Sequence, residues 1–106
     1  MNIAEFKEFI HFGLTSQDIN NTSVPLSLKD CHQETFMPLL NNVLELISEK
    51  AKEWKTVPML AHTHGQPASP TLLGKEMQVF AYRLEQQLAY FAFIPFAAKF
   101  GGATGN

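Results

Sequence analysis

The stretch FMPLLNNVLELISEKAKEW, residues 36–54, decides the fold class of this chain. Its apolar residues recur every three or four positions and charged residues occupy the other faces, which is typical of an amphipathic helix. The apolar stripe consists of Phe36, Leu40, Val43, Ile47, Ala51 and Trp54. A second stripe has the same spacing and consists of Leu73, Met77, Phe80, Leu84, Leu88 and Phe91. The sequence therefore predicts an all-α fold with long antiparallel helices.

The bounds of the two helices follow from the stripes and from the breaking residues between them. We expect the first helix at about residues 16–54, with kinks or breaks where Pro25 and Pro38 fall in its interior. The second is expected at about residues 70–100, and the segment at about 55–69 is expected to be an irregular loop. Two helices in a hairpin bury only part of their apolar faces, so we expect further helices to cover the rest.

The segment HTHGQPASP, residues 62–70, is the first candidate for chemistry. Gly65 and Pro67 break regular structure, Ser69 can cap a helix, and Pro70 suits the first helical position. Histidine has the unperturbed pKa nearest neutrality and can give or take a proton during a reaction. A surface or hydrogen-bonding role is the alternative for a histidine in such a loop.

A metal site is not expected at these histidines. His62 and His64 form a His-x-His pair, but zinc requires three or four nitrogen or sulfur ligands. The remaining candidates are distant in the sequence and form no Cys-x-x-Cys motif; they are His11, Cys31 and His32.

A second candidate cluster is HFGLTSQDINNTS, residues 11–23. Thr15 followed three residues later by Asp18 is a capping-box pattern and predicts a helix start. The free backbone N–H groups of a helix start, joined by the hydroxyls of Thr15 and Ser16, suit a carboxylate or a phosphate. Ordinary helix capping explains the same residues without a ligand.

Composition excludes several classes of protein. Eight basic and ten acidic residues give a net charge of −2 without a basic cluster, so a nucleic-acid partner is not expected. The single cysteine, Cys31, fits a reducing compartment. No signal peptide is recognised, and the apolar run at residues 88–98 is too short for a membrane span and contains Pro95. We therefore expect a soluble, cytoplasmic protein without a membrane partner.

Three motifs together resemble the fumarase/aspartase superfamily and, within it, the adenylosuccinate lyase family. They are HFGLTSQDINNTS at residues 11–23, MLAHTHGQPASPTLLGKE at residues 59–76, and GGATGN at residues 101–106. One departure is His62, where relatives commonly carry arginine. The resemblance covers essentially the whole chain, which we expect to be an internal piece of such an enzyme.

The resemblance implies a fold, a reaction and an assembly. The fold is the central helical bundle of a homotetramer, in which each active site takes segments from three subunits. The reaction is the β-elimination of fumarate from adenylosuccinate, or from the succinylated carboxamide precursor of purine biosynthesis, without a cofactor. The Ser-Ser-x-Met-Pro-x-Lys loop that supplies the general base in the family does not occur in these 106 residues.

The resemblance also implies roles for individual residues. His64 is the expected general acid, and Thr15 and Ser16 are expected to bind the succinyl carboxylates. The expected neighbouring contacts are Thr63, Gln66 and His11. Lys75 could pair with a substrate anion or remain a solvated helix residue.

Other interpretations remain open at this point. One is a different lyase or a cycloisomerase of the same superfamily, and another is a non-catalytic helical assembly module. The glycine-rich end lacks the Gly-Lys-Ser/Thr of a phosphate-binding loop. Gly101 is instead a candidate C-cap for the second helix.

Overall fold

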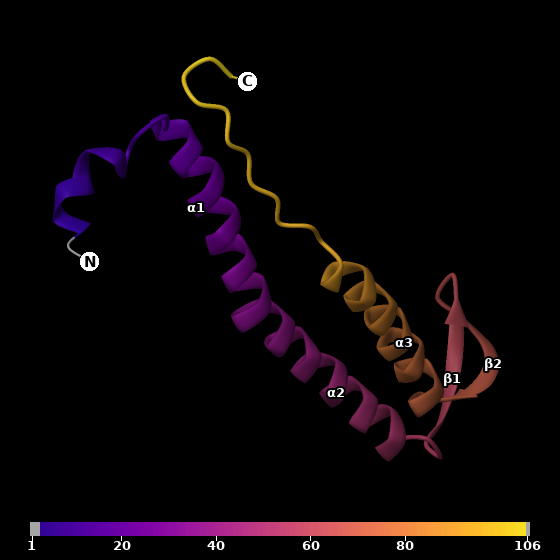
Figure 1. The fold of residues 1–106 in the computed structure, drawn as a ribbon. Helices are drawn as coiled ribbons and strands as arrows, with labels where there is room; N and C mark the ends of the chain where they lie inside the picture. The colour runs from indigo at the N-terminus through magenta and orange to yellow at the C-terminus, as the bar shows by residue number, and fades with distance from the viewer. Residues whose placement is uncertain (1–2, 106) are drawn as a thin grey trace. The chain divides into compact units, whose positions relative to one another are not determined.

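The computed structural model describes residues 3–105 of the chain. These residues belong to two compact units, one made of Met1–His32 with Pro95–Asn106 and the other of Gln33–Ile94. The elements of each unit can be followed along the chain in Figure 1. Each unit is described by itself.

The first unit contains the 3-10 helix η1 (Ile3–Phe9) and the helix α1 (Ser16–Cys31). Thr15 is the N-cap of α1, with an extended backbone at φ −115° and ψ 168°. α1 therefore begins where the capping pattern predicts a helix start. Pro25 lies inside α1 without ending it.

The long first helix has no break at a proline, and it departs from α-helical geometry only after α1. A π-helical stretch of five residues, His32–Phe36, separates α1 from α2 (Met37–Glu53). Pro38 lies in the first turn of α2, directly after the π-helical stretch. Both prolines are therefore accommodated.

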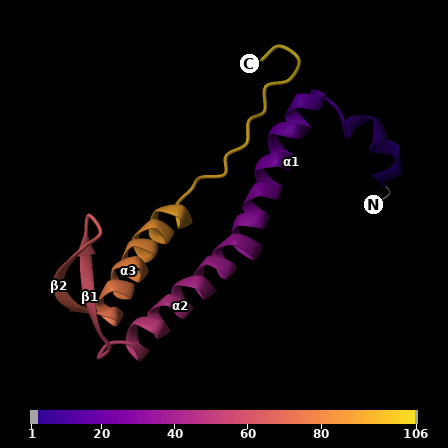
Figure 2. The same cartoon turned by 180° about the vertical axis from the view of Figure 1, so that it is seen from behind.

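The second unit contains α2, the strands β1 (Pro58–Thr63) and β2 (Gln66–Leu72), and α3 (Leu73–Ala92). α2 and α3 run side by side and the two strands lie at one end of the pair (Figure 2). The buried hydrophobic residues among those described are Ala51, Ala81 and Leu88. They are few, so this helix pair encloses only a thin core.

The expected loop at about residues 55–69 is wrong, because most of it is a β-hairpin. β1 and β2 pair antiparallel, with Pro58 opposite Leu72 and Thr63 opposite Gln66. A strand of a two-stranded ribbon is paired along one edge only, so it tolerates prolines that lack an N–H. Ser69 and Pro70 consequently lie in β2 and do not begin a helix.

The second helix is shorter than expected. α3 covers Leu73–Ala92 and not about residues 70–100. Pro95 follows shortly after its end, and the residue before a proline disfavours helical geometry. Gly101 therefore does not cap α3. Within residues 3–105, no helix is both long enough and apolar enough to cross a membrane.

Candidate active site

The turn of the β1–β2 hairpin carries His64. Thr63 and Gln66 are paired, so His64 and Gly65 alone form the turn, with φ values of +49° and +74°. A type I′ turn requires positive φ at both central residues. This region is uncommon for a residue with a Cβ, although histidine enters it more often than most. The strand ladder thus holds an exposed His64 at the hairpin tip.

His62 lies on β1, two residues before His64. Its Nδ1 is 3.1 Å from the Leu60 carbonyl oxygen. Because a carbonyl only accepts hydrogen bonds, this contact favours the tautomer with hydrogen on Nδ1 and leaves Nε2 as an acceptor. The ladder is irregular between Leu60 and His62, where the register shifts. His62 is thereby oriented by its own strand, whereas His64 has no such carbonyl bond among the described residues.

Thr15 and Ser16 lie at the start of α1, as predicted. The Thr15 backbone N–H and hydroxyl both donate to Asp18 Oδ2, at 2.8 and 3.1 Å. Ser16 is exposed, and its hydroxyl makes no hydrogen bond with another residue in the range 3–105. The two hydroxyls therefore differ, since the hydrogen of Thr15 is already used within the protein.

Asp18 connects α1 to the glycine-rich segment of the same unit. Its Oδ1 accepts hydrogen bonds from the N–H groups of Gly101 and Gly102, at 2.8 and 3.2 Å. The side chain is buried, with 4% of its surface exposed. The Gly101 and Thr15 backbone amides stabilise the charged carboxylate and lower the pKa of Asp18 below its ordinary value.

A close approach of two glycines accompanies these bonds. A Cβ added to Gly102 would lie 3.3 Å from the carbonyl oxygen of Gly13. Gly102 also has a φ of +59°, a conformation that favours glycine. Asp18 and Gly102 thus hold the glycine-rich segment against the residues that lead into α1.

The expected site residues are distributed over the two units. Thr63, His64 and Gln66 are brought together at one turn of the second unit. His11, Thr15 and Ser16 lie in the first unit, and His11 is exposed in the turn that precedes the N-cap. Lys75 is exposed in the first turn of α3.

Sequence reasoning identified Asp18 only as a capping residue. Its bonds to Gly101 and Gly102 span 83 and 84 positions, and no local sequence pattern predicts them. A pair of adjacent glycines after the second helix was the only available signal.

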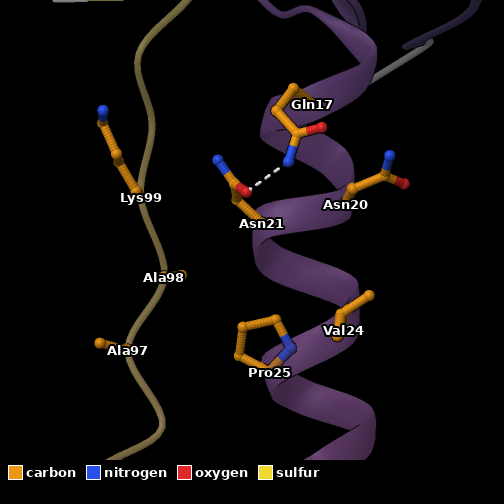
Figure 3. Close-up of a pocket in the computed structure, with 8 residues that line it drawn as sticks. All are labelled: Gln17, Asn20, Asn21, Val24, Pro25, Ala97, Ala98 and Lys99. Carbon is orange, nitrogen blue, oxygen red and sulfur yellow. Dashed lines mark hydrogen bonds between the residues drawn. The ribbon is translucent and has the colours of Figure 1, made fainter.

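Sequence reasoning also missed a pocket in the first unit. It has a volume of about 440 Å³ and lies between α1 and the C-terminal segment (Figure 3). Gln17 Nε2 donates to Asn21 Oδ1 at 2.7 Å on its wall. Its amide groups offer hydrogen bonds, but no histidine or carboxylate lines it. Across the described part of the chain, no three His, Cys, Asp or Glu side chains are grouped as metal ligands.

Comparison with solved structures defines the class of fold. The 3-carboxy-cis,cis-muconate lactonizing enzyme from Pseudomonas putida matches 91% of this chain with a TM-score of 0.81 and 26% identity. The fumarate lyase:delta crystallin from Brucella melitensis matches 76% of it with a TM-score of 0.69 and 27% identity. The fold is therefore that of the helical fumarate lyase superfamily, with a two-stranded hairpin added to the predicted helices.

Sequence comparison identifies the family. The sequence pattern described as "Lyase" matches residues 2–106, and the chain belongs to this lyase family. "Adenylosuccinate lyase" of Dictyostelium discoideum is 54% identical over 101 residues, which are 93% of this chain. The resemblance inferred from the three motifs is thereby confirmed. The chain spans 22% of the length of that relative, and 22% and 19% of the two solved structures.

Proposed function

We propose that this chain is part of an enzyme that releases fumarate from adenylosuccinate by β-elimination. The observation that carries the proposal is the 54% identity to the adenylosuccinate lyase of Dictyostelium discoideum over 93% of the chain. In this reaction a base removes a proton next to a carboxylate, negative charge builds on that carboxylate, and the C–N bond breaks. The leaving nitrogen must then receive a proton.

His64 is proposed as the general acid that gives this proton. Its exposed position at the hairpin tip supports the proposal, since an acid has to reach a leaving atom in a bound substrate. Thr63 and Gln66 flank it as a cross-strand pair and can contact the same substrate. His62 is not proposed for this role, because the family motif places the acid at His64, and the Leu60 carbonyl holds the His62 ring along its own strand.

The start of α1 is proposed to bind the succinyl carboxylates. Ser16 offers a hydroxyl, and the N–H groups of the first helical turn carry the positive end of the helix dipole. Negative charge that develops on a carboxylate is stabilised by such fixed donors. His11 is a proposed neighbour of this carboxylate site.

A cycloisomerase is the second candidate function. The TM-score of 0.81 to the muconate lactonizing enzyme favours it, but the identity there is 26%, against 54% to the adenylosuccinate lyase. Identity decides between them, because one fold carries several reactions.

Product analysis of the full-length protein tests the proposal. Incubation with adenylosuccinate should yield AMP and fumarate in equal amounts, and incubation with 3-carboxy-cis,cis-muconate should yield no lactone. The isolated 106-residue chain should yield neither product, because it spans 22% of the relative's length. Lactone without fumarate from the full-length protein would reverse the choice between the two functions.

We also propose that the enzyme is a cytoplasmic homotetramer with active sites shared between subunits. The resemblance supports both points. The exposed apolar residues of α2 and α3, among them Leu39 and Phe80, support the association of subunits.

A further inference from the structure

The Asp18 carboxylate joins two segments that are far apart in the sequence. It accepts four hydrogen bonds, two from Thr15 and two from the N–H groups of Gly101 and Gly102. A buried carboxylate is favourable only when such donors replace water, and here the donors come from both segments. Asp18 therefore holds the glycine-rich segment at the start of α1.

The same carboxylate separates the roles of Thr15 and Ser16. A hydroxyl has one hydrogen, and that of Thr15 is directed to Asp18 Oδ2 at 3.1 Å. Thr15 thus cannot donate to a substrate carboxylate while this bond is present. Ser16 follows directly in the chain and keeps its hydroxyl hydrogen available.

We propose that Asp18 is a positioning residue of the substrate carboxylate site, acting through Thr15 and through Gly101 and Gly102, while Ser16 is the hydroxyl that contacts the substrate. The inference rests on the proposed function. Asp18 does not touch the substrate in this arrangement. Thr15 supports the site through its bond to Asp18 and does not bind the substrate with its hydroxyl.

Steady-state kinetics of the full-length enzyme test the inference. Asp18→Asn should raise the KM for adenylosuccinate about tenfold and change kcat much less, because a bond to a charged group is lost at the binding site and not at the acid. Thr15→Val should behave in the same way, and Thr15→Ser should restore the wild-type KM because it keeps the hydroxyl. Asp30→Asn, an exposed change on the same helix, is the control and should leave KM unchanged.

A double-mutant cycle tests whether Thr15 and Asp18 affect substrate binding through the same contact or independently. Thr15→Val and Asp18→Asn both act on the hydrogen bond between these two side chains, so their combined effect on KM should be no larger than the greater single effect. Ser16→Ala should raise KM further in the Asp18→Asn background. Full additivity of Thr15→Val with Asp18→Asn would overturn the inference.

Hydrogen exchange gives a readout that does not depend on activity. The peptide containing Gly101 and Gly102 should exchange faster in Asp18→Asn than in the wild type, because a neutral amide has one acceptor oxygen where the carboxylate has two charged ones. If Asp18→Asn does not fold, Gly102→Ala replaces it. The added Cβ would lie 3.3 Å from the Gly13 carbonyl oxygen and push the glycine-rich segment away from Asp18. The same rise in KM is therefore expected.

The outcomes distinguish this inference from the proposed function. A wild-type enzyme that releases no fumarate overturns the proposed function and the substrate role of Asp18 with it. An active wild type combined with unchanged KM and unchanged exchange in a folded Asp18→Asn overturns the inference alone.

Discussion

His64 is the one described residue other than glycine with a positive φ, at +49°. Such a conformation costs about 1 kcal/mol or more for a residue with a Cβ, so it persists only where the surrounding structure enforces it. Here the pairing of Thr63 with Gln66 enforces it. Strain of this kind often lies at functional positions, which agrees with the proposed role of His64.

The first prediction separates the two hairpin histidines. In the full-length enzyme, His64→Asn should lower kcat by roughly 10² to 10⁴, the usual effect of losing a positioned general acid. Asparagine tolerates a positive φ, so this variant should melt close to the wild-type temperature. The matched change His62→Asn should mainly affect binding or hairpin geometry. An equal or larger kcat loss at His62 would contradict the assignment.

The second prediction concerns the stability contributed by Asp18. Its pKa in the folded protein lies below the ordinary value of 3.8, so folding favours the charged form. This stabilisation is fully present above pH 3.8 and disappears as the pH falls through the lower, folded-state pKa.

Melting curves of wild type and Asp18→Asn from neutral to acidic pH provide the measurement. The wild type should melt higher at neutral pH, and the difference should shrink as the pH falls below 3.8. Asp30→Asn controls for the loss of one charge on α1 and should differ little from wild type at neutral pH. A difference for Asp18→Asn that grows on acidification would refute the sign of this linkage.

At the scale of the elements, Gly74 sets how closely α3 approaches the end of α2. A Cβ at this position would overlap the Ala51 carbonyl oxygen and lie 2.6 Å from the Lys55 backbone. Both contacts are with backbone, which cannot rotate away. The Gly74 N–H also donates to the Trp54 carbonyl at 3.0 Å, so a hydrogen bond holds the start of α3 against the end of α2.

The third prediction follows from this contact. Gly74→Ala should destabilise the full-length protein by about 1–3 kcal/mol or more, the usual range for overpacking, despite the better helix propensity of alanine. Gln78→Ala, at an exposed position one turn later, should leave stability nearly unchanged. Chemical denaturation monitored by circular dichroism measures both. A Gly74→Ala variant as stable as the wild type would show that α2 and α3 can separate freely.

At the scale of the whole molecule, the two apolar stripes are only partly buried. Ala51 and Leu88 are 4% and 6% exposed, whereas Phe36 and Phe80 on the same stripes are 52% and 58% exposed. Apolar surface of this extent favours contact with further protein, because its burial removes it from water.

The fourth prediction is that the 106-residue chain associates. Light scattering at tens of micromolar should give a mass above that of one chain. Phe80→Lys should weaken association because it places a charge on the stripe, and Glu85→Lys, on the same helix but off the stripe, is its control. A cooperatively melting monomer would contradict the prediction.

Features that depend on residues close together in the sequence were predicted, whereas features that depend on distant residues were not. The spacing of residues such as Ala51 and Leu88 predicted the helices, because a helix is built from contacts three and four residues apart. Thr15 and Asp18 predicted the start of α1 for the same reason. The motifs around Thr15 and His64 also sufficed to recognise the superfamily.

The hairpin could not be predicted in the same way. Pro67 and Pro70 indicated a loop and a helix start, but both lie in β2. Whether a proline is tolerated in a strand depends on which edge of that strand is paired, and pairing is a property of two segments. The positive φ of His64 follows from the same pairing.

By itself, the sequence determined the helical class and the family, and it predicted the residues of the candidate site. Only the tertiary structure decided that Asp18 bonds Gly101 and Gly102 and that Gly74 meets the Ala51 carbonyl. The physical reason is that periodicity and capping act between neighbours in the chain. Contacts across 83 positions depend instead on how the chain closes a long loop, which no local pattern describes.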